Sequence, residues 1–81
     1  MTQPFDIFVE WDAEARVWYV TDSGVPGLAT EADTLEALVE KVRMMVPELL
    51  ELNDHPAALR HGTDVPIHVH AERLERIRAA G

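Results

Sequence analysis

Acidic residues alternate along the first apolar segment of this 81-residue chain and are candidates for chemistry. Asp6, Glu10 and Asp12 share one side of an extended strand, on which residues two apart are separated by about 6.6 Å. Carboxylates at this spacing can form an acid–base pair or a metal site only if a third group converges from elsewhere. The sequence identifies no such group, and alternating acids are typical of a solvated strand face. We therefore predict no catalytic residues and no metal site here.

Two histidines near the end of the chain form the second candidate. His68 and His70 also project from one side of a strand, about 6.6 Å apart, and an imidazole pair can bind zinc or nickel. Two ligands do not make a stable site, and His55 and His61 show no diagnostic spacing. We predict that both histidines are polar residues on the solvent-exposed side of an edge strand, and that they bind no metal and no other cofactor.

Other reaction chemistries lack the residues that they require. The chain has no cysteine, which excludes a thiolate nucleophile, a disulfide framework and sulfur-containing zinc sites. Ser23 is the only serine and has no nucleophile-elbow pattern around it. Gly24 and Gly27 fit neither dinucleotide-binding nor P-loop spacing. We therefore predict that the chain is not an enzyme.

The charge balance bears on possible partners. Fifteen Asp and Glu against seven Lys and Arg give a formal charge of −8, which repels phosphate backbones and attracts cationic surfaces. Direct nucleic-acid binding is disfavoured, and the charge fits either simple solubility or a basic protein partner. Neither a signal-peptide pattern nor a long apolar stretch is visible, so we expect a cytoplasmic protein without membrane contact.

Hydrophobic periodicity predicts the strands that position these residues. Apolar residues alternate over residues 5–11, and β-branched and aromatic residues fill 17–21, which predicts a hairpin. A turn rich in glycine leads to a third strand over 28–32. A fourth strand is predicted around Ile67 and Val69, followed by a short helical tail over 71–80.

Residues 35–50 place apolar side chains at helical spacing and predict an amphipathic helix. We expect it to begin at Asp33 and to end at Asn53. Pro47 predicts a kink near Met45 and Val46, and the alternative is a helix that ends there and restarts with Pro47 in its first turn. The resulting β-β-β-α-β order defines one α+β domain over residues 1–81, with a core over about 5–70 and one helix on one face of the sheet.

One helix covers only one face of a four-stranded sheet, so aromatic surface must emerge on the other face. Such a patch usually marks an interface. We predict self-association, as a dimer or tetramer, through Phe8, Trp18 and Val20. In the alternative, the tail over 71–80 folds over this surface.

The segment from Pro26 to Leu38 resembles the strand-to-helix passage of HicB antitoxins. It contains a Pro-Gly turn, a short strand and an Asp-Thr-hydrophobic-Glu helix start. An uncharacterised HicB-like subfamily is similar in further motifs, namely Trp11–Asp12, Glu14–Ala15, Val17–Trp18 and Pro47–Asn53. The resemblance rests on the order and spacing of these motifs and covers residues 5–70.

This resemblance implies a partial ribonuclease-H-like fold without nuclease activity. It also implies a partner, since HicB proteins neutralise HicA toxins, which are small basic proteins that cleave messenger RNA. An acidic surface can occupy the cationic face with which such a toxin binds RNA. From charge and expected exposure, we hypothesise that the partner-binding residues are Glu10, Asp12, Glu14 and Asp22.

The sequence also departs from typical HicB antitoxins, many of which carry a carboxy-terminal DNA-binding segment. Only about ten residues follow the last predicted strand here, so we carry over no expectation about operator binding from the resemblance. Ala32 stands where a glycine is frequent, which is consistent with a divergent subfamily. A second hypothesis from a different class is an oligomeric protein that binds a small ligand or a metal at His68 and His70.

Overall fold

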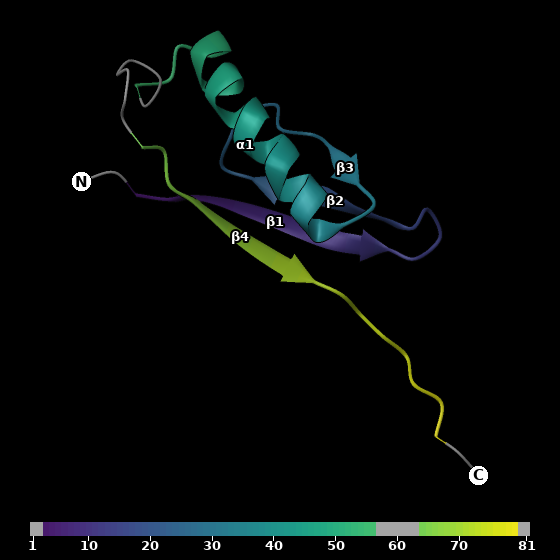
Figure 1. The fold of residues 1–81 in the computed structure, drawn as a ribbon. Coiled ribbons are helices and arrows are strands. Elements are labelled where there is room, and N and C mark those ends of the chain that lie inside the picture. Colours follow the sequence, from purple (N-terminus) through teal and green to yellow (C-terminus); the bar gives the residue numbers. More distant parts are fainter. Residues whose placement is uncertain (1–2, 57–63, 80–81) are drawn as a thin grey trace.

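The computed structural model describes residues 3–56 and 64–79 and contains one sheet and one helix (Figure 1). Its element order confirms the predicted β-β-β-α-β order and the α+β class. The elements are β1 (Phe5–Asp12), β2 (Val17–Ser23), β3 (Glu31–Ala32), α1 (Leu35–Leu52) and β4 (Ile67–Glu72).

The four strands form a mixed sheet in the order β3-β2-β1-β4. β1 pairs with β2, and β2 with β3, in antiparallel fashion, whereas β1 and β4 are parallel. β4 therefore forms one edge of the sheet, and α1 lies across one face (Figure 1). β1, the first strand of the chain, is thus a central strand of the sheet and lies beside β4, the last strand.

The hairpin between β1 and β2 is closed by a side chain of β1. Asp12 Oδ1 accepts hydrogen bonds from the backbone N–H groups of Glu14 and Ala15, at 2.9 and 3.1 Å. The Arg16 N–H donates to the Asp12 carbonyl at 2.7 Å, with Arg16 in the left-handed region at φ 60°. Because Asp side chains readily bond to backbone two or three residues on, Asp12 specifies this turn.

A second turn carries the chain from β2 under the helix. The Ser23 hydroxyl accepts from the Val25 N–H at 2.8 Å, and Gly27 adopts a φ of +78° that side chains rarely tolerate. Val25 and Leu28 are consequently buried in the core. β3 is shorter than the predicted strand over 28–32, since Leu28 donates to the Val25 carbonyl within the turn.

α1 begins one residue later than expected. Its N-cap is Thr34, whose hydroxyl accepts from the Ala37 N–H at 3.1 Å, whereas the prediction placed the cap at Asp33. The predicted end at Asn53 is confirmed, and the Asn53 side-chain amide donates to the Leu49 carbonyl at 2.8 Å. The helix is continuous through Pro47, so the alternative in which it ends and restarts is wrong.

The core lies between α1 and the face of the sheet that it covers. Every fourth residue of α1 from Leu38 to Leu50 is buried, and these side chains pack with Ile7 and Val9 of β1. This spacing keeps one helical stripe in contact with the sheet. The buried core comprises Ile7, Val9, Val25, Leu28, Ala32, Leu38, Val42, Val46 and Leu50.

The predicted helical tail over 71–80 is wrong for the residues that the structure describes. Ala71 and Glu72 continue β4, paired with Val9 and Glu10, and residues 73–79 form no helix. Every described residue of this tail is exposed, and short helices without a surface to pack on are marginal in water. The tail leads away from the sheet, so it does not cover the face opposite α1 (Figure 1).

Within residues 3–56 and 64–79, no helix has both the length and the apolar character needed to cross a membrane.

Candidate functional site

The side of the sheet opposite α1 is the candidate site, and we call it the open face. It carries the even-numbered residues of β1, because successive side chains of a strand point to opposite sides. The strand register places on the same side the residues that pair with them. The open face consists of Asp6, Phe8, Glu10, Asp12, Val17, Tyr19, Asp22, Glu31, His68, His70 and Glu72.

Charge is distributed unequally between the two faces. All Asp and Glu residues of the strands lie on the open face, and the four strands contain no Lys or Arg. One row crosses the whole sheet and places acids on both sides of an aromatic ring. Its members, in strand order, are Glu31, Tyr19, Glu10 and Glu72. The open face is therefore a negatively charged surface with no compensating strand cation.

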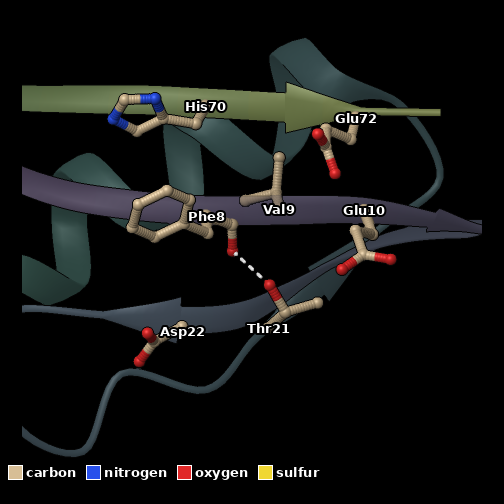
Figure 2. Close-up of a pocket in the computed structure, with 7 residues that line it drawn as sticks. All are labelled: Phe8, Val9, Glu10, Thr21, Asp22, His70 and Glu72. Atoms are coloured by element: carbon tan, nitrogen blue, oxygen red, sulfur yellow. Dashed lines mark hydrogen bonds between the residues drawn. The ribbon is translucent and has the colours of Figure 1, made fainter.

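A hollow of about 430 Å³ lies in the middle of the open face (Figure 2). A bulge between Phe8 and Val9 interrupts the pairing of β1 with β2, and the Thr21 hydroxyl donates to the Phe8 carbonyl at 3.2 Å. The remaining side chains come from three adjacent strands. The hollow is lined by Phe8, Val9, Glu10, Thr21, Asp22, His70 and Glu72. Its lining combines the aromatic ring of Phe8 with the carboxylates of Glu10, Asp22 and Glu72, and this combination suits a cationic group.

Aromatic side chains form the apolar part of the open face. Phe8 and Tyr19 are 40% and 37% exposed, although both lie in strands. The ring of Phe8 stacks on that of His70, with a centroid distance of 4.5 Å and an angle of 14° between planes. Aromatic residues are enriched at protein interfaces, so these exposed rings are candidates for contact with a partner.

Two histidines and one carboxylate converge at the end of the open face where β1 begins. Asp6 pairs with His68 across the parallel strands, and His70 Nε2 lies 2.8 Å from Asp6 Oδ1. The centroids of the two imidazole rings are 4.7 Å apart. One potential ligand atom from each residue lies within 4.8 Å of the others. Asp6 thus adds a carboxylate to the two histidines, which alone are too few ligands for a stable site.

The predicted partner-binding residues occupy different environments. Glu10 and Asp22 lie on the open face and line the hollow. Asp12 also lies on this face, but its carboxylate accepts two amides of the hairpin turn, so its first role is structural. Glu14 lies in that turn and is exposed. The structure therefore brings Glu10 and Asp22 together and adds Glu72, which was not among the predicted residues.

The predicted self-association residues do not share one surface. Phe8 lies on the open face, whereas Trp18 and Val20 pair with residues of the covered face and pack against the core. The three residues therefore lie on two sides of the sheet and not on one surface. Tyr19 is the β2 aromatic residue on the open face, and strict alternation from Trp18 could have identified it. Whether the chain forms a homo-oligomer stays a prediction.

The fold and the open face define a small α+β protein with an acidic sheet surface. Residues 5–80 match the family described as "Domain of unknown function (DUF1902)", and the chain belongs to this family. It is similar to the crystal structure of the hypothetical protein TTHA1013 from the extremely thermophilic bacterium Thermus thermophilus. The identity is 39%, over 91% of this chain and 99% of that chain, with a TM-score of 0.58. Comparison with curated proteins found no match.

Proposed function

We propose that this protein is a non-enzymatic, antitoxin-like binding domain of HicB type whose open face binds a small basic toxin of HicA type. The observation that carries the proposal is the segregation of every strand carboxylate onto one uncovered face without Lys or Arg. Complementary potentials accelerate encounter and disfavour wrong partners. The cationic surface of an RNA-cleaving toxin is the partner chemistry that this face fits best.

The fold supports the proposal, as do the residues that resemble HicB proteins. The β-β-β-α-β order, with a mixed sheet and one helix on one face, is the arrangement expected of a partial ribonuclease-H-like HicB fold. The resembling passage from Pro26 to Leu38 spans β3 and the first turn of α1. We include this fold assignment in the proposal.

The open face offers both parts of a typical interface. Phe8 and Tyr19 supply aromatic area that a partner can desolvate, and such residues often dominate binding energies. Glu10 and Glu72 stand beside each other and can meet Lys or Arg of the toxin. A toxin surface engaged in this way could not hold the RNA backbone at the same time. Inhibition then follows from occupancy and needs no chemistry.

Co-expression with a small basic protein encoded beside this chain tests the proposal. We expect a stable complex and relief of growth inhibition in cells that produce the toxin. The informative variant combines Glu10→Lys with Glu72→Lys on the open face. Since electrostatic steering raises association rates about 10–10³-fold, we expect its association to slow by at least about tenfold at low salt.

A second double variant controls for total charge. Glu48→Lys with Glu51→Lys changes the formal charge by the same amount, but both residues are exposed on α1, away from the open face. Its association rate should stay within about twofold of the unmodified protein, because local potentials dominate steering. Equal slowing of both variants, or the absence of a complex and of growth relief, would remove the proposal.

A further inference from the structure

We propose that Asp6, His68 and His70 form a binding site for one divalent transition-metal ion, with Zn²⁺ or Ni²⁺ as the best match. The site lies where β1 begins and joins two strands that are far apart in sequence. It does not depend on the toxin partner, because all three ligands come from this chain.

The distances permit shared coordination of one ion. Metal–nitrogen and metal–oxygen bonds of about 2.0–2.2 Å place two ligand atoms of one ion at most about 4.4 Å apart. Asp6 Oδ1 and His70 Nε2, at 2.8 Å, already satisfy this limit. The ligand atoms of the trio all lie within 4.8 Å of one another, so only a small side-chain rotation is needed. Asp6 and His68 are exposed, so their side chains have room for this rotation.

The parallel register explains why these residues meet. Asp6 and His68 are direct partners across β1 and β4, and His70 follows on the same side of β4. Phe8, the partner of His70, stacks on the imidazole ring and limits its orientation. Two ligands therefore come from one strand and the third from its neighbour, and one ring is held in place by packing.

The donor set selects the class of metal. Two imidazoles with one carboxylate suit zinc, nickel and related transition metals, whereas magnesium and calcium favour oxygen ligands alone. Three protein ligands leave at least one coordination position open to solvent. The acidic open face raises the local concentration of cations. Without metal, His70 Nε2 lies 2.8 Å from Asp6 Oδ1, and an ion bound by both atoms would replace this direct contact.

A bound ion would link the edge strand β4 to β1 and so stabilise their pairing. β4 pairs only with β1 among the described strands, and the trio spans these two strands. A ligand that binds the folded state alone shifts the folding equilibrium toward that state. Zinc should therefore raise the midpoint of thermal unfolding, in addition to producing a binding signal.

Calorimetric titration of the untagged, metal-free chain with ZnCl₂ and NiCl₂ tests this site. We expect one ion per chain and a rise in Tm that grows with metal concentration. His68→Asn and Asp6→Asn should each weaken binding by at least about 10–100-fold, because even outer-shell partners contribute that much to metal affinity. Zinc should also shift the imidazole NMR signals of His68 and His70.

Two control variants remove the same kinds of group, a carboxylate and histidines, from outside the trio. Glu10→Gln removes a carboxylate from the same face but outside the trio, and it should leave the affinity within about threefold, since only screened field effects change. His55→Asn with His61→Asn removes the other two histidines of the chain and should leave one ion bound. Unchanged binding in His68→Asn, or equal loss in either control, would overturn the site. Both readouts proceed without a toxin, so they can fail independently of the proposed function.

Discussion

The two faces of the sheet use the same strands for different purposes. On β1, Ile7 is fully buried against α1, whereas the next residue, Phe8, is 40% exposed on the other side. The covered face is apolar and continues into the core, while the open face carries all carboxylates of the strands. Alternation along each strand thus separates the residues that stabilise the fold from those available for recognition.

The open face is not arranged for maximal stability. Glu10 and Glu72 are direct cross-strand partners, and like charges in this position destabilise a sheet. Natural proteins often retain such unfavourable features where function requires them. The difference between the faces therefore leads to predictions of opposite sign.

The largest effect is expected from removing core volume on the covered face. Leu50→Ala, at a fully buried position of α1, should lower the free energy of unfolding by about 2–5 kcal/mol. Leu52→Ala, two residues later and 80% exposed, should change it by less than about 0.5 kcal/mol. Urea unfolding followed by circular dichroism measures both. Similar losses in the two variants would contradict the packing of α1 against the sheet.

A smaller effect is expected where α1 is anchored above the covered face. Thr34→Ala removes the hydroxyl that accepts the Ala37 N–H and should destabilise the protein by about 0.5–2 kcal/mol. Thr34→Ser keeps the accepting oxygen and should remain close to the unmodified protein. The same urea titration measures both variants. An equal loss of unfolding free energy in the serine variant would show that Thr34 does not stabilise the protein through its N-cap hydrogen bond.

The smallest effect, with the opposite sign, is expected on the open face. Glu72→Gln relieves repulsion with Glu10 and should raise the free energy of unfolding by roughly 0.2–1 kcal/mol. Glu36→Gln, in the first turn of α1, removes a favourable interaction with the helix dipole and should lower it by about 0.3–1 kcal/mol. Both changes should shrink at high salt, because exposed charges are screened. A Glu72 variant that is less stable at low salt would show that this carboxylate is compensated.

Local sequence patterns predicted most of the strands and the helix, but not which segments pack against one another. Alternation identified β1, and apolar spacing identified α1 and its end at Asn53, because both signals reside within one segment. The tail over 71–80 was predicted as a helix, yet residues 73–79 form none, and Leu74 and Ile77 are 80% and 93% exposed. Element type in such segments depends on tertiary contacts that composition does not contain.

The candidate sites were predictable to different degrees. The acidic side of β1 followed from spacing, and Glu10 was correctly placed there. Trp18 and Val20 lie on the covered face and not beside Phe8, because the register of β2 against β1 decides which side faces the helix. The Asp6–His68–His70 trio was missed, since a carboxylate from the first strand meets the histidines only if β1 and β4 are adjacent and parallel.

By itself, the sequence determined which side chains share a side of β1, which stripe of α1 is apolar, and the acidic charge of the chain. These are local properties, set by the backbone period and by residue type. Only the tertiary structure decided which sheet face stays open and which strands lie side by side, and hence that Asp6 lies beside His68 and His70. Strand pairing depends on burial and register over the whole chain, and no local segment encodes it.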